Sequence, residues 1–155
     1  MSDYPDFTIG TLYKAIRADR KEWTVGWYMQ KYDVFGVLEH FIFFSEKASK
    51  WEYAPINADT LCRYTGYTDA FDNDIWEHDI VETDDHLNGE VLFGEHGTEI
   101  GWYIQWKDKE AEYYRQDFGY WVHKAIIKVI GNIFFEKETI HGFNKQSDKS
   151  DQGSC

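Results

Sequence analysis

The chain has 155 residues, a formal net charge of −12 and an isoelectric point near 4.8. Hydrophobic residues make up 43% of it, which excludes a wholly disordered chain and suffices for the core of one domain or of two small lobes. The acidic charge repels phosphate backbones and therefore argues against general nucleic-acid binding.

The N-terminal part of the chain, about residues 8–58, predicts a lobe built as a β-hairpin or meander, because its aromatic and β-branched residues favour strands. A first strand is expected near 9–18, and strict alternation over 22–30 predicts a second. One face of that second strand carries Trp23, Val25, Trp27 and Met29. Residues 36–45 are apolar on both faces and predict a third strand, which the loop at 32–35 joins to the second as a long hairpin.

The stretch from about residue 60 to 137 predicts a barrel-like lobe, because short strand patterns alternate there with turn signals. The expected strands are 79–83, 90–93, 99–106, 120–123 and 126–135. The rings of Trp102 and Trp106 share the inward face of one strand, and we expect them in a core or in a wall between the lobes. Residues 107–112 predict a helical turn or a charged loop, and the polar residues 142–155 predict a flexible tail.

The sequence also predicts the compartment. Residues 1–10 lack the basic and apolar regions of a secretory signal, and no apolar run approaches membrane-spanning length. Cys62 and Cys155 are expected to be free thiols in a reducing cytosol. Acidic residues interrupt the densest basic cluster, which we interpret as solvated surface and which consists of Lys14, Arg17, Arg20 and Lys21. We therefore expect a cytoplasmic protein without a membrane segment and with weak nucleic-acid affinity.

No pattern in the sequence predicts a catalytic or metal site. Counting a calcium loop from Asp72 puts Glu77 at the sixth position, where that loop needs glycine. The acid-flanked residues His78, His86 and His96 lack the spacing of metal ligands. Nucleophile elbows and glycine-rich phosphate loops are missing from the sequence as well. We therefore expect no enzyme activity, no cofactor and no intrinsic metal.

Three stretches, taken in order, are more specific. Residues 63–69 read Arg-Tyr-Thr-Gly-Tyr-Thr-Asp, residues 74–81 read Asp-Ile-Trp-Glu-His-Asp-Ile-Val, and residues 127–134 read Ile-Lys-Val-Ile-Gly-Asn-Ile-Phe. With Gly-Glu-Val-Leu-Phe at 89–93 and the strand that begins at Trp23, they resemble the YopX family of phage and prophage proteins over roughly residues 12 to 137. The motif positions are Tyr64, Thr65, Gly66, Asp69, Asp79, Gly131 and Asn132.

The resemblance implies one YopX-like β domain over about residues 1–141, with an SH3-like barrel in its C-terminal part, in the cytoplasm of a bacterial host cell. It implies no established activity, since a fold does not decide a function. Two positions depart from the family pattern, in which glycines stand at the positions of Asp74 and His78. If either position has a positive φ angle, the non-glycine residue there must tolerate it.

The 29 aromatic residues exceed what a chain of this size is expected to bury completely. We therefore expect a surface for a protein partner or for self-association. Its candidate residues are Tyr67, Trp76, Tyr113, Tyr114 and Trp121. A monomer whose two lobes bury these rings is the alternative. The leading hypothesis is a non-enzymatic binding or assembly protein, and the alternative is a nucleic-acid-associated protein or an acidic mimic of DNA.

Overall fold

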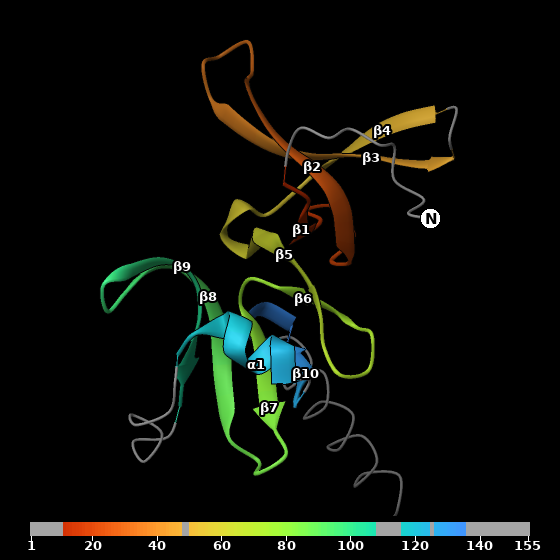
Figure 1. The fold of residues 1–155 in the computed structure, drawn as a ribbon. Coiled ribbons are helices and arrows are strands. Elements are labelled where there is room, and N and C mark those ends of the chain that lie inside the picture. Colours follow the sequence, from red (N-terminus) through yellow and green to blue (C-terminus); the bar gives the residue numbers. More distant parts are fainter. Residues whose placement is uncertain (1–10, 48–49, 108–115, 125, 136–155) are drawn as a thin grey trace, which may run out of the picture. The chain divides into compact units, whose positions relative to one another are not determined.

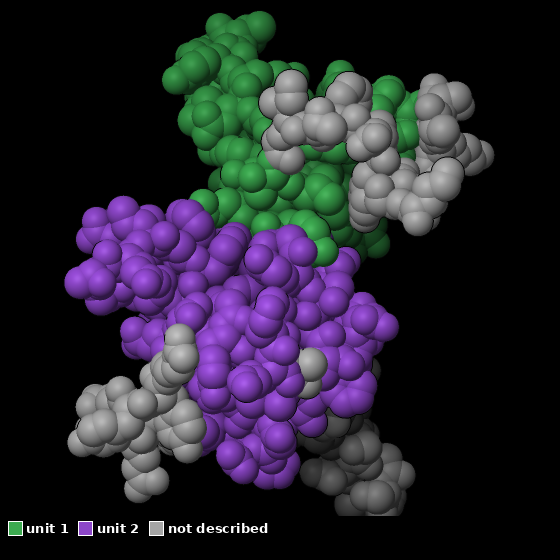
Figure 2. All heavy atoms as spheres, viewed as in Figure 1, with its two compact units in different colours: residues 1–64 green, residues 65–155 purple. Residues whose placement is uncertain are grey.

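The computed structural model describes residues 11–47, 50–107, 116–124 and 126–135 (Figure 1). The protein is mainly β, as the sequence predicts, and its strands form two antiparallel sheets. The chain divides into two compact units, residues 1–64 and residues 65–155, which Figure 2 colours green and purple.

Unit 1 is an antiparallel sheet in which the first four strands pair in sequence order as hairpins, and the first strand also pairs with the fifth. Its strands lie in the order β4-β3-β2-β1-β5, and β5 continues into unit 2. The elements are β1 (Tyr13–Ile16), β2 (Trp23–Tyr32), β3 (Leu38–Lys47), β4 (Lys50–Pro55), the 3-10 turn η1 (Ala58–Thr60) and β5 (Cys62–Thr68). The predicted strands near 9–18, 22–30 and 36–45 are therefore present in the described residues, and the long hairpin is confirmed as β2 and β3.

The core of unit 1 lies on one face of this hairpin. Ala15, Ile42 and Ile56 are buried there. The opposite face carries a row of aromatic rings from three strands, and within it Phe43 stacks on Trp51 at 4.8 Å between ring centroids. Gly26 lies on the core face where β2 approaches β3, and a Cβ atom at this position would come within 2.1 Å of the Phe43 carbonyl oxygen. This close approach requires glycine.

Unit 2 contains a four-stranded antiparallel sheet in the order β10-β7-β8-β9. Its elements are β6 (Asp74–Trp76), β7 (Asp79–Thr83), β8 (Asn88–His96), β9 (Glu99–Trp106), the helix α1 (Phe118–Lys124) and β10 (Ile127–Asn132). The core consists of Ile75, Val81, Val91, Ile104, Phe118, Trp121 and Ile127. Trp102 and Trp106 pack against it, so the predicted core role of their shared face is confirmed.

Three expectations for unit 2 differ from the structure. Strand β10 ends at Asn132, and residues 133–135 are helical although the expected strand runs to residue 135. Residues 120–123 form part of α1 and not a strand. Phe118 and Trp121 lie one helical turn apart and are both buried, so the helical period governs this segment although its residues favour strands. The sheet is open among the described residues, so the SH3-like barrel is not confirmed.

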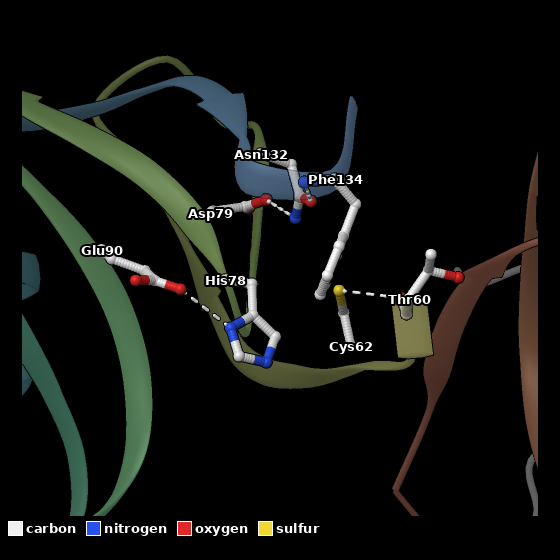
Figure 3. A network of polar contacts seen from close by, with 7 residues as sticks. All are labelled: Thr60, Cys62, His78, Asp79, Glu90, Asn132 and Phe134. Carbon is white, nitrogen blue, oxygen red and sulfur yellow. Dashed lines mark hydrogen bonds and ion pairs between the residues drawn. The ribbon is translucent and has the colours of Figure 1, made fainter. Parts of the chain in front are cut away.

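Two sequence predictions lie outside the described residues, namely most of the segment 107–112 and the tail 142–155. Within the part of the chain that the structure describes, no helix is long and apolar enough to cross a membrane. Cys62 is buried, and its Sγ lies 3.3 Å from the Thr60 carbonyl oxygen (Figure 3).

Candidate functional site

The motif residue Asp69 holds the turn between β5 and β6. Its side chain is buried, and its carboxylate accepts hydrogen bonds from the backbone N–H groups of Phe71 (2.8 Å), Asn73 (2.9 Å) and Val129 (2.9 Å). Burial alone would raise the pKa of Asp69, but these bonds outweigh burial and lower the pKa below its ordinary value. The carboxylate therefore joins a local turn to β10, 60 residues further along the chain.

A second motif pair lies where β7 meets β10 (Figure 3). The Asn132 side-chain amide donates to Oδ1 of Asp79 at 3.0 Å, and the Trp76 backbone N–H donates to Oδ2 at 2.8 Å. The Asn132 side-chain oxygen accepts from the Phe134 backbone N–H at 3.0 Å. Asp79 and Asn132 are both buried. A buried carboxylate is tolerated only when its oxygens accept hydrogen bonds, and both oxygens of Asp79 do so here. These bonds link β7 to β10 and to the end of β6.

His78 stands at the tight turn between β6 and β7. Its φ angle is 69°, in the left-handed region where glycine is favoured, so this departure from the family pattern carries backbone strain. Three contacts hold it. Its backbone N–H donates to the Val91 carbonyl at 2.7 Å. Its Nδ1 lies 2.9 Å from Oε1 of Glu90, and its ring meets Phe134 edge-on at 5.3 Å (Figure 3). The second departure from the family pattern is Asp74, which is not among the described residues with a positive φ angle. The positive φ angle in that turn belongs to Asp72, two residues earlier.

The remaining motif residues are also structural. Thr65 donates through its hydroxyl to the Ile75 carbonyl at 2.7 Å, and Gly66 has a φ angle of 84°. The backbone N–H of Tyr64 donates to the Leu12 carbonyl at 2.8 Å. Gly131 lies at a bulge in the pairing of β10 with β7. Both motif carboxylates, Asp69 and Asp79, thus accept hydrogen bonds from other groups of the same chain, which is typical of a structural role.

The described residues hold no cluster of three or more His, Cys, Asp or Glu side chains that could bind a metal ion. The ion pair of Glu82 with Lys128, at 3.3 Å, joins the neighbouring strands β7 and β10, and the hydrogen bond from Lys128 lowers the pKa of Glu82 below its ordinary value. The arrangement of described polar groups therefore favours a structural role for the motif over acid–base chemistry.

The candidate interface residues separate into three groups. Trp76 and Trp121 are only 7% and 6% exposed and belong to the interior of unit 2, so these two are corrected from interface to core. Trp121 belongs to the core cluster of unit 2, where its ring meets Trp106 edge-on at 5.1 Å. Tyr67 is 49% exposed, and its ring packs edge-on against Phe118 at 5.8 Å between ring centroids. Tyr113 and Tyr114 lie outside the described residues.

A more exposed apolar surface lies in unit 1, where sequence reasoning predicted only a loop. We call it the hairpin tip and define it as residues 32–38, which connect β2 and β3 and project from the rest of unit 1 (Figure 1). Val34 and Phe35 are 93% and 87% exposed. The signal in the sequence was Asp-Val-Phe-Gly, a turn whose central residues are apolar where polar residues are usual.

The comparisons with known proteins agree with the motif. The family model described as YopX protein matches residues 13–140. No curated protein and no solved structure matches the chain. The match covers most of the sequence and spans both units, and we conclude that the chain belongs to the YopX family.

Proposed function

We propose that the chain is a non-enzymatic binding or assembly protein, encoded by a phage or prophage, that acts on a protein partner in the cytoplasm of the bacterial host. The observation that carries this proposal is the hairpin tip. Large apolar side chains exposed together on a soluble protein mark interaction surfaces. Val34 and Phe35 lie at the apex of the tip, with Tyr32, Val37 and Leu38 exposed beside them.

The tip is also ordered before it binds. The Asp33 carboxylate accepts from the backbone N–H groups of Phe35 at 2.8 Å and Val37 at 2.9 Å, and the Gly36 backbone N–H donates to the Asp33 carbonyl at 3.1 Å. Gly36 has a φ angle of 80°, which glycine adopts without strain. A surface that is already in its bound shape loses less conformational entropy on association. This property supports a binding role for the tip.

An acidic mimic of DNA is the second candidate, and the distribution of charge favours it. Residues 1–64 carry 8 Lys and Arg against 9 Asp and Glu, while residues 65–155 carry 8 against 19, so nearly all of the net charge of −12 belongs to unit 2. Such a unit could occupy the nucleic-acid site of a host protein. An SH3-like arrangement of unit 2 stays part of the proposal, supported by its antiparallel strands β7, β8 and β9.

Affinity capture from lysate of the bacterial host tests the proposal. The bait is the full chain, compared with Phe35→Ser and with the matched control Ile100→Ser, which removes a side chain 73% exposed in unit 2. Burying a Phe side chain contributes about 1.5–3 kcal/mol, so Phe35→Ser should weaken capture of a specific partner roughly 10- to 100-fold. Ile100→Ser should capture as much as the unmodified chain. Equal capture by all three baits contradicts the role of the tip.

The mimic gives a different result in the same experiment. Capture of DNA-binding proteins that survives Phe35→Ser, and that falls steeply as salt is raised, supports the acidic surface of unit 2 instead.

A further inference from the structure

We propose that a cavity in unit 2, between the β5–β6 turn and the strands β7 and β10, binds a basic segment of a protein partner and takes up one aromatic side chain of that segment. The inference deepens the second candidate function, the acidic mimic of DNA, on which it rests, and it does not involve the hairpin tip. It arises from an apolar cavity that lies within the acidic unit of the chain.

The cavity has a volume of about 370 Å³, and its apolar lining comes from Ala70, Phe71, Ile126 and Ile127. Ile127 is buried and Phe71 is 69% exposed, so apolar surface continues from the core of unit 2 to the solvent. The Ala70 backbone N–H donates to the Ile127 carbonyl at 3.1 Å, which joins the turn to β10. The volume lies at the small end of the range for binding pockets, and this suits one large side chain.

Carboxylates form part of the same lining. Glu82 and Asp84 contribute to it, together with Lys128. Lys128 lies 3.3 Å from Glu82, so these two charges largely compensate each other. Asp84 and its neighbour Asp85 are exposed on the β7–β8 turn and make this side of the cavity negative. The cavity therefore presents apolar surface and negative charge together.

The charge of unit 2 determines which kind of partner is complementary to it. Residues 65–155 carry 8 Lys and Arg against 19 Asp and Glu, a net charge of −11. Such a surface attracts segments rich in Lys and Arg and repels acidic ones. A second copy of this chain is unfavourable by the same argument, because both of its units are negative, and so is a membrane of anionic lipids. Charge complementarity therefore favours a basic occupant.

The apolar lining indicates what else this occupant carries. Proteins that bind single-stranded nucleic acids combine Lys and Arg side chains along the backbone with aromatic rings on which the bases stack. A mimic that occupied such a surface through charge alone would leave these rings in water. A cavity that is apolar inside and has carboxylates beside it can bury one ring while the carboxylates pair with the neighbouring Lys or Arg. We therefore assign the occupant to a basic segment with an aromatic side chain.

Fluorescence anisotropy of a labelled peptide, titrated with the full chain, tests this assignment. The probe is a short peptide with one Trp flanked on both sides by Lys, and the reference peptide has Ala in place of Trp. We expect the Trp peptide to bind roughly 10-fold more tightly. Phe71→Ser should remove most of this difference, because it removes apolar lining. The matched control Ile100→Ser, which removes an exposed side chain from β9, should preserve it.

Two charge reversals separate the cavity from the general charge of unit 2. Asp84→Lys and Glu99→Lys change the net charge by the same amount, but Asp84 lies on the β7–β8 turn and Glu99 at the opposite end of β8. Asp84→Lys should weaken binding of the Trp peptide roughly 10-fold, and Glu99→Lys by no more than about 2-fold. In methyl NMR spectra the peptide should shift the resonances of Ile126 and Ile127 and leave that of Ile100 unchanged.

Three results overturn the inference: no binding of the Trp peptide up to about 1 mM, equal affinity for the Trp and Ala peptides, or equal weakening by the two charge reversals. Phe35→Ser should leave peptide binding unchanged, so none of these results bears on the hairpin tip. The acidic mimic survives without the anchored ring if the capture of DNA-binding proteins is sensitive to salt and persists in both Phe35→Ser and Phe71→Ser.

Discussion

Replacing Asp69 by Ala tests whether the family motif is a structural framework. The buried carboxylate accepts three backbone N–H groups, and Ala leaves all three without this acceptor. Each hydrogen bond to a charged group contributes about 1.5–3 kcal/mol, but the bonds share one acceptor and water will reach part of the turn, so we expect a total loss near 3 kcal/mol. Asp69→Asn keeps one carbonyl oxygen and should lose roughly half as much.

Urea unfolding followed by tryptophan fluorescence measures this loss as a change in the free energy of unfolding. The control is Asp85→Ala, which removes an exposed carboxylate from the β7–β8 connection and should change stability by less than about 0.5 kcal/mol. A loss below about 1 kcal/mol for Asp69→Ala, or a loss equal to that of the control, would refute the framework role.

The same variant has a pH signature. The pKa of Asp69 is lowered in the folded protein from an ordinary value of 3.8. A depressed pKa contributes stability that is fully present above the unfolded value and is lost as pH falls through the folded value. The gap in stability between the parent chain and Asp69→Ala should therefore be constant from pH 7 to about pH 5 and narrow below about pH 4. A gap that stays constant to pH 3 would show that the carboxylate charge is not responsible.

Three further predictions concern the other motif positions and the acidic charge. Asn132→Asp places a second carboxylate against Asp79, so thermal melting at pH 7 should show a loss of more than about 2 kcal/mol in the free energy of unfolding. This loss should shrink near pH 4, where carboxylates become protonated, and an equal loss at both pH values would contradict the pairing. His78→Ala should be less stable to urea than His78→Gly by about 1–2 kcal/mol, because only glycine relieves the φ angle of 69° while both variants lose the Glu90 contact; equal stabilities would argue against strain. Direct binding to DNA or RNA should be weak in a gel shift at about 150 mM salt, because the net charge of −12 opposes association, and tight binding there would refute this reading of the charge.

Local patterns were sufficient for much of unit 1. The alternation that begins at Trp23 and the apolar run that ends at Ser45 identified the β2–β3 hairpin, because side-chain period and turn residues act over a few positions. The same reasoning failed at Tyr120–His123, where strand-favouring residues form a helix. Tertiary packing of Phe118 and Trp121 against the sheet overrode their local preference there.

The candidate site was less accessible to sequence reasoning. The bond from Val129 to Asp69 spans 60 residues, and no local pattern encodes it. The sequence indicated where backbone strain would arise if the φ angle were positive, because histidine stands at position 78 where the family pattern has glycine. The structure has this positive φ angle. The exposure of Val34 and Phe35 was not predicted, because the pattern at residues 32–35 indicates a loop but does not show which of its side chains face the solvent.

Amide hydrogen exchange, measured on the full chain alone and in complex with whatever partner it captures, tests the central claim most directly. If the hairpin tip is the binding surface, peptides that cover residues 32–38 should exchange more slowly in the complex, and the slowing should disappear with Phe35→Ser. Exchange at residues 32–38 that is identical in the free and bound chain would contradict the account.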